Sequence, residues 1–88
     1  MRTVVTLIDD EPSVLHSLGL LLEKGGYQVH MHQDAQSFLQ STQAGDVIIS
    51  DVRMPQMTGL ELLRKLRSEN RIEPVILLTG HGDIEKEY

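Results

Sequence analysis

Three apolar runs in this 88-residue sequence end in side chains that could carry chemistry. Short, nearly continuous apolar runs predict strands that are buried on both faces. The runs and their last polar side chains are TVVTLI (3–8) before Asp9 and Asp10, VIIS (47–50) before Asp51, and VILLT (75–79) with Thr79. A carboxylate beside a core is costly unless it is paired, bound to a metal or used in a reaction. These four side chains are therefore the candidates for a functional site.

The carboxyl ends of neighbouring parallel strands meet at one rim of a sheet, which is where ligands bind in open α/β folds. Three carboxylates at one rim raise one another's pKa unless a cation neutralises them. A set of oxygen ligands without His or Cys favours Mg²⁺. An Asp carboxylate beside Mg²⁺ can attack phosphorus and form an acyl phosphate, and Thr79 could hydrogen-bond a phosphoryl oxygen. The pattern predicts a metal-assisted phosphoryl-acceptor site.

Helices are expected between the strands because apolar side chains, mostly leucines in the first and third helices and Phe38 with Leu39 in the second, follow each candidate cap. A helix is predicted to begin at Pro12 and to stop at Gly25-Gly26, and a polar strand to follow over 27–32. Asp34 can cap a short helix that closes before Gly45, and Thr58 can cap a helix with Leu60, Leu62, Leu63 and Leu66. The order βαβαβαβ predicts a parallel sheet with right-handed crossovers.

Composition limits the class of protein. The length allows one domain, and the 40% of residues that are apolar suffice for a core. The net charge of −5 argues against direct binding of nucleic acid. The sequence has no cysteine and no apolar run long enough to span a membrane, so a cytoplasmic location is expected. His30 and His32, and the basic run Arg64, Lys65 and Arg67, are interpreted as solvated surface.

Two simpler interpretations compete with this site. An Asp at a strand end is more often a cap or turn residue, but its repetition at successive strand ends favours a site. An enzyme of the haloacid-dehalogenase type also uses an aspartyl phosphate, with its nucleophile in a DxD pattern after the first strand. Here the residue two beyond Asp9 is Glu11, which disfavours the enzyme.

Three motifs in order, IDDEP (8–12), IISDVRMPQMTG (48–59) and VILLTGHGD (75–83), resemble the receiver domain of bacterial two-component response regulators. The motif sequences are most similar to the FixJ-like branch, with the NtrC-like branch as the alternative. The resemblance runs from Thr3 to about Ile84. It implies a flavodoxin-like, doubly wound sheet with strand order 2-1-3-4. It also implies a cytoplasmic signalling and transcription-regulating role, and not a turnover enzyme.

The resemblance also implies roles for individual residues. Asp51 would accept a phosphoryl group from a sensor histidine kinase, and Asp9 and Asp10 would hold Mg²⁺ together with Asp51 and the backbone carbonyl of Arg53. Thr79 matches the switch hydroxyl, Gly80 the small residue beside it, and Pro55 and Gly59 the turn into the next helix. Gln56 stands where many relatives have glycine, which predicts a stiffer turn.

The sequence departs from the family at its end. Relatives continue with a helix, a strand and a further helix, and that strand brings a lysine that pairs with the phosphoryl group. Residues 1–88 are therefore expected to form an incomplete receiver domain without an effector domain, in which Lys86 falls in the first turn of a helix. Slow or absent phosphoryl transfer and an exposed edge on the fourth strand, open to homodimer formation, would follow. The alternative function is a phosphorylation-impaired receiver that acts as a binding or self-associating module.

Overall fold

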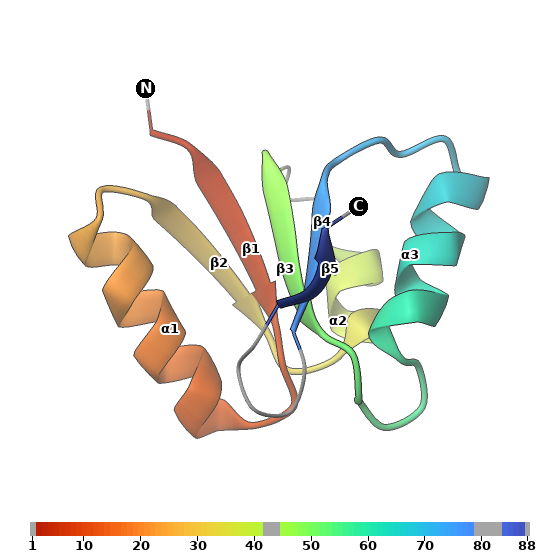
Figure 1. The fold of residues 1–88 in the computed structure, drawn as a ribbon, viewed down its shortest axis with the longest axis horizontal. Coiled ribbons are helices and arrows are strands. Elements are labelled where there is room, and N and C mark those ends of the chain that lie inside the picture. Colours follow the sequence, from red (N-terminus) through yellow and green to blue (C-terminus); the bar gives the residue numbers. More distant parts are fainter. Residues whose placement is uncertain (1, 42–44, 79–83, 88) are drawn as a thin grey trace.

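The computed structural model describes residues 2–41, 45–78 and 84–87 of the chain (Figure 1). Within them, strands and helices alternate up to the fourth strand, as predicted. The elements are β1 (Val4–Ile8), α1 (Pro12–Lys24), β2 (Gln28–His32), α2 (Ala35–Gln40), β3 (Val47–Asp51), α3 (Gly59–Ser68), β4 (Val75–Leu78) and β5 (Ile84–Glu87). None of the helices in these ranges is long and apolar enough to cross a membrane.

The first four strands are parallel, and the sheet has the order β2-β1-β3-β4-β5. The predicted order 2-1-3-4 is therefore confirmed. In the register, Ile8 lies beside Ser50, and Asp51 lies beside Leu78. The carboxyl ends of β1, β3 and β4 thus reach the same rim of the sheet.

The fourth strand does not form the edge of the sheet, so that prediction was wrong. β5 pairs with β4 in the antiparallel direction, with Lys86 opposite Leu77 and a register shift between Leu77 and Leu78. Lys86 therefore lies in a strand and not in the first turn of a helix. The charged sequence of β5 gave no strand signal, but the unpaired backbone groups along β4 offer hydrogen bonds to any segment that returns beside it. The exposed edge on which the predicted homodimer depended is covered by β5.

The helices are divided unequally between the two faces of the sheet (Figure 1). α2 and α3 cover one face, and their cluster of buried residues comprises Ile8, Ala35, Phe38, Ile48, Met54, Leu62, Leu63, Leu66, Val75 and Leu77. α1 covers the other face, where the buried cluster is only Val5, Leu7 and Leu15. Most of the apolar burial is therefore on the side of α2 and α3.

Local side-chain hydrogen bonds begin two of the helices as predicted. The Asp34 carboxylate accepts a hydrogen bond of 2.6 Å from the backbone N–H of Ser37 at the start of α2. Thr58 and Glu61 exchange side-chain and backbone hydrogen bonds in a capping box at the start of α3. The hydrogen bonds from Thr58 lower the pKa of Glu61. Such caps satisfy backbone groups that a helix terminus leaves unpaired.

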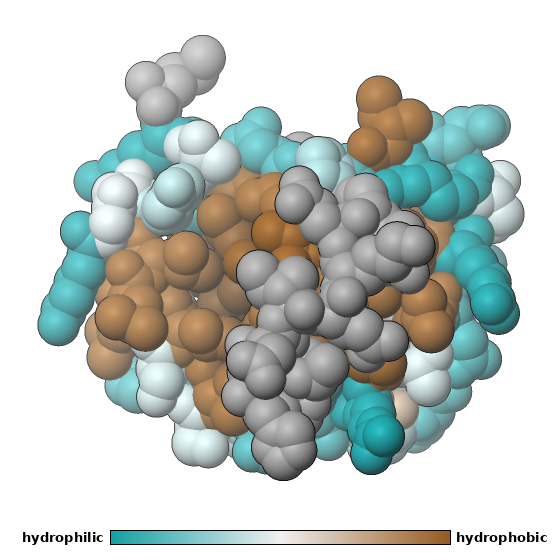
Figure 2. Space-filling view, in the orientation of Figure 1, coloured by the Kyte–Doolittle hydropathy of each residue, from teal (hydrophilic) through white to brown (hydrophobic). Residues whose placement is uncertain are grey.

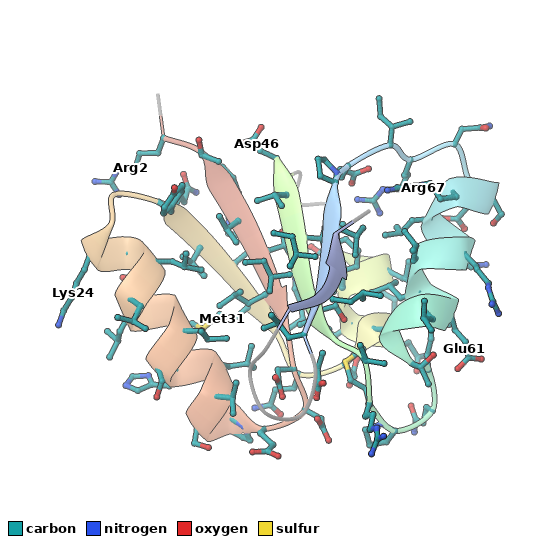
Figure 3. The ribbon with its side chains drawn as sticks, viewed as in Figure 1. Arg2, Lys24, Met31, Asp46, Glu61 and Arg67 are labelled. Atoms are coloured by element: carbon teal, nitrogen blue, oxygen red, sulfur yellow. The ribbon has the colours of Figure 1, made fainter. Side chains whose placement is uncertain are left out.

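The connection from α3 to β4 is held by two arginines. The guanidinium of Arg67 donates hydrogen bonds to the carbonyl oxygens of Arg71 (2.8 Å) and Glu73 (2.9 Å). Arg71 pairs with Glu73 and lies over the ring of Phe38, 5.1 Å from its centroid. Figure 3 shows Arg67 and Glu61 at opposite ends of α3. Arg67 is exposed, but its guanidinium binds the backbone of this connection. The sequence-based interpretation of a solvated basic face missed this role.

Candidate metal centre

The fold brings three of the predicted site residues together. Asp9 directly follows β1, Asp10 comes next, and Asp51 is the last residue of β3. Each of them offers a carboxylate oxygen, and these oxygens all lie within 4.8 Å of one another. The pairing of β1 with β3 explains this arrangement, because it places the ends of the two strands side by side.

Asp9 is the most buried of the three carboxylates, with 8% of the residue exposed. Burial raises the pKa of Asp9, and the charges of Asp51 and Asp10 raise it further, against the opposing effect of a hydrogen bond from Glu11. That hydrogen bond runs from the backbone N–H of Glu11 to Oδ1 of Asp9 and is 2.9 Å long. Ionisation of Asp9 therefore destabilises the folded protein, and a nearby cation would offset this effect.

The donor set fits a hard divalent cation. It is made of carboxylate oxygens, the ligand type that Mg²⁺ prefers, and it combines a buried carboxylate with two that are partly exposed. Within the described ranges, the salt bridges join Lys65 to Glu69 and Arg71 to Glu73, so neither one neutralises the cluster. A bound Mg²⁺ could keep water ligands on the open side.

The loop after Asp51 is fixed by backbone hydrogen bonds. The N–H of Val52 donates to the carbonyl oxygen of Leu78 over 2.9 Å, and the N–H of Gly59 donates to the carbonyl oxygen of Val52 over 2.9 Å. The N–H of Arg53 donates to Oδ1 of Asp51 over 3.3 Å. A backbone N–H of the loop therefore fixes the position of the Asp51 carboxylate. The predicted role of the Arg53 carbonyl as a metal ligand stays a prediction.

Gly59 allows the loop to pack against the start of α3. A Cβ at this position would lie 2.5 Å from the carbonyl oxygen of Asp51 and 2.9 Å from Cδ2 of Leu77. Both distances are shorter than normal van der Waals contact, so a side chain here would displace the acceptor loop. The sequence indicated a turn at Gly59, and this close approach is its physical reason.

Two further residues near Asp51, one in the loop and one in β3, have specific local features. Gln56 has a φ of 72°, in the left-handed region that glycine adopts without strain. Ser50 is completely buried, and its hydroxyl donates to the carbonyl oxygen of Asp51 over 3.0 Å. The sequence reasoning missed this role of Ser50, although a lone hydroxyl inside an apolar strand is a signal for such a bond.

Thr79 and Gly80 lie outside the described residues, so their predicted roles are not tested. The preceding residue, Leu78, is the last of β4 and pairs with Asp51 in the register. The chain therefore leaves β4 at the same rim as the carboxylates.

Comparison with protein families gives one match that spans nearly the whole chain. The family model described as the response regulator receiver domain matches residues 5–87. The transcriptional regulatory protein FixJ of Rhizobium meliloti is 43% identical over 82 residues, which are 91% of this chain and 40% of that protein. The C4-dicarboxylate transport transcriptional regulatory protein DctD of Pseudomonas aeruginosa is 43% identical over 86 residues, which are 94% of this chain and 18% of that protein. The chain thus spans less than half of these relatives.

Solved structures agree with this match. FixJ-N superposes with a TM-score of 0.84 at 40% identity, over 97% of this chain and 70% of that chain. The response regulator StyR superposes with a TM-score of 0.84 at 34% identity, over 98% of this chain and 44% of that chain. The predicted flavodoxin-like arrangement of four parallel strands is confirmed by these superpositions and by the strand order.

Proposed function

Because this chain belongs to the response regulator receiver domain family, we propose that it accepts a phosphoryl group on Asp51 in a Mg²⁺-dependent reaction. Receiver domains are signalling modules of two-component systems, and their phosphoryl donors are sensor histidine kinases. The observation that carries the assignment to Asp51 is the cluster of three carboxylates, whose oxygens lie within 4.8 Å of one another. Asp51 is the member of the cluster that ends a central strand and is partly exposed.

In the proposed reaction, a carboxylate oxygen of Asp51 attacks the phosphorus of a phosphohistidine. A P–O bond forms, the P–N bond breaks, and the histidine nitrogen keeps the electron pair and takes up a proton. Asp9, Asp10 and Asp51 would hold Mg²⁺, with the Arg53 carbonyl as a further ligand. When bound, Mg²⁺ offsets the negative charge of the carboxylates and of the phosphoryl oxygens.

The residues around Asp51 support this role in two ways. The N–H of Arg53 and the hydroxyl of Ser50 hold the two ends of the residue, at the carboxylate and at the backbone carbonyl. Asp9 stays close because the N–H of Glu11 binds its carboxylate. We infer that Thr79, the residue after Leu78, hydrogen-bonds the phosphoryl group once it is attached.

The test is phosphorylation by a small phosphodonor. The chain is incubated with acetyl phosphate and Mg²⁺, and its intact mass is measured. We expect one phosphoryl adduct on the wild type, none on Asp51→Asn, and a wild-type yield on Glu23→Gln, which removes an exposed carboxylate on α1. Omission of Mg²⁺ should abolish the adduct.

A wild type that gains no adduct would overturn the proposal. If that protein were still stabilised by Mg²⁺, the result would favour a phosphorylation-impaired receiver that acts as a binding module. An adduct that persists on Asp51→Asn would move the acceptor to another residue. A part in transcriptional regulation, which the names of FixJ and DctD state for those proteins, remains a prediction for this chain, and so does a cytoplasmic location.

A further inference from the structure

Ser50 carries a hydroxyl into the apolar core of the molecule. Apolar residues are visible at the surface on the face of the sheet that carries α1 (Figure 2). Ser50 points to the other face, like Ile48 two residues earlier, because side chains alternate along a strand. No part of Ser50 is exposed. Burial of a hydroxyl is unfavourable unless a hydrogen bond offsets it, so this position is expected to use the hydroxyl.

The Ser50 hydroxyl contacts two groups at and after the end of β3. It donates to the carbonyl oxygen of Asp51 over 3.0 Å, and its oxygen lies 4.0 Å from the sulfur of Met54, which is a weaker acceptor. Met54 is 7% exposed and belongs to the same buried cluster as Ile48. Ser50 therefore joins the peptide group that begins the acceptor loop to the residue that anchors this loop in the core.

The Asp51 carbonyl is also held by the start of α3. A Cβ at Gly59 would lie 2.5 Å from this oxygen, so the backbone of Gly59 packs closely against it. The N–H of Gly59 also donates to the carbonyl oxygen of Val52, the next residue of the loop. The peptide group that follows Asp51 is thus fixed by both Ser50 and Gly59. Its orientation determines the path of the chain through Val52 to Arg53, whose carbonyl is the predicted metal ligand.

We propose that Ser50 is a positioning residue for the metal centre, although its side chain points to the opposite face of the sheet from that of Asp51. This inference rests on the Mg²⁺ site of the proposed function. The hydroxyl fixes the Asp51 peptide group, and this group in turn fixes Arg53, whose N–H binds the Asp51 carboxylate. Because the hydroxyl binds the backbone and not the carboxylates, its loss should weaken Mg²⁺ binding without slowing phosphorylation at saturating Mg²⁺.

Titration of the isotope-labelled chain with Mg²⁺, followed by nuclear magnetic resonance, tests this proposal. Ser50→Ala should raise the dissociation constant of Mg²⁺ by roughly 10-fold, at the lower end of the effect of losing a residue that orients a metal ligand. Ser50→Cys, whose thiol is a weaker donor, should fall between Ser50→Ala and the wild type. The matched control is Thr6→Val, which removes another buried hydroxyl, in β1 and beside Gly45. This control should bind Mg²⁺ like the wild type.

Phosphorylation by acetyl phosphate at several Mg²⁺ concentrations gives a second readout. In Ser50→Ala, the Mg²⁺ concentration at half-maximal rate should rise by the same factor, and the rate at saturating Mg²⁺ should match that of the wild type. A wild-type affinity for Mg²⁺ in Ser50→Ala, or an equal loss in Thr6→Val, would overturn the positioning role.

The wild type separates this inference from the proposed function. A wild type that binds no Mg²⁺ would overturn the metal site and the role of Ser50 with it. A wild type that binds Mg²⁺ but gains no adduct would overturn only the proposed phosphorylation, and the affinities of the variants would still decide the role of Ser50. Circular dichroism confirms that each variant is folded, and Ser50→Cys decides the test if Ser50→Ala is not.

Discussion

Two regions of the molecule share β3 but differ in the side chains that they bring together: one is an apolar core, and the other is a cluster of carboxylates. Beneath α2 and α3, Ile48 and Leu66 are almost completely buried among aliphatic side chains. At the carboxyl end of the same strand, Asp51 lies beside Asp9 and Asp10, and the like charges act against the folded state. The apolar core stabilises the folded state, and the repulsion among the three carboxylates destabilises it. Substitutions in the two regions should therefore change stability in opposite directions.

The largest effect is expected in the core. Leu66→Ala removes a side chain with no exposed surface and leaves a cavity under α3. We expect the free energy of unfolding to fall by about 3 kcal/mol. Urea denaturation followed by circular dichroism measures this change. Ile72→Ala, at an exposed position between α3 and β4, should change it by less than about 0.5 kcal/mol. Similar losses in both variants would contradict the burial described for Leu66.

The next effect is expected where the core meets the rim. Gly59→Ala places a Cβ against the carbonyl oxygen of Asp51 and should cost about 2 kcal/mol, although alanine favours helices. It should also reduce the yield of the phosphoryl adduct, because the acceptor loop must move. Gly25→Ala is the matched control, since its Cβ would meet no atom closer than 3.4 Å. An unchanged stability in Gly59→Ala would show that the loop adapts freely.

At the rim, removal of a charge should stabilise the protein. The pKa of Asp9 is raised, so the folded chain holds this proton to a higher pH than the unfolded chain does. Stability is therefore lost as the pH rises from the unfolded value through the folded value. We expect Asp9→Asn to raise the melting temperature at pH 7 without metal, and to have little effect near pH 3.

Mg²⁺ should offset the destabilisation that the carboxylates cause at the rim. Millimolar Mg²⁺ should raise the melting temperature of the wild type at pH 7 by a few degrees, because it relieves the repulsion among the carboxylates. The shift should be much smaller in Asp9→Asn and in Asp51→Asn, and unchanged in Glu23→Gln. An equal shift in all four proteins would count against a metal site at this rim.

The smallest effect is expected in the turn after the acceptor. Gln56 adopts a positive φ, which costs a side-chain-bearing residue about 1–2 kcal/mol, while glycine adds unfolded-state entropy that offsets part of the gain. Gln56→Gly should therefore stabilise the protein by about 0.5 kcal/mol. Asn70→Gly should give less, since asparagine tolerates its φ of 62° better than glutamine does. Thermal melts at matched concentration measure both.

The sequence predicted those features that depend on local chemistry or on strand order. Asp34 and Thr58 cap their helices because each bonds a backbone group three residues ahead. The carboxylate cluster was predictable because strand ends in a parallel sheet share a rim. β5 was missed because its pairing depends on the free edge of β4 and not on its own composition. The close approach of Gly59 to Asp51 and Leu77 joins segments that only the folded chain brings together. The bonds from Arg67 span a few residues but depend on the path of the connection from α3 to β4, which no residue pattern indicates.

The pairing of β1 with β3 has a kinetic consequence for the rim. These parallel strands are joined through α1, β2 and α2, so no local hairpin can bring Asp9 to Asp51. Long-range pairing of this kind is slow, because the entropy of loop closure is lost before the stabilising contacts form. The metal centre should therefore assemble late in folding. Mg²⁺ would then slow the unfolding of the finished domain and leave the rate of its refolding nearly unchanged.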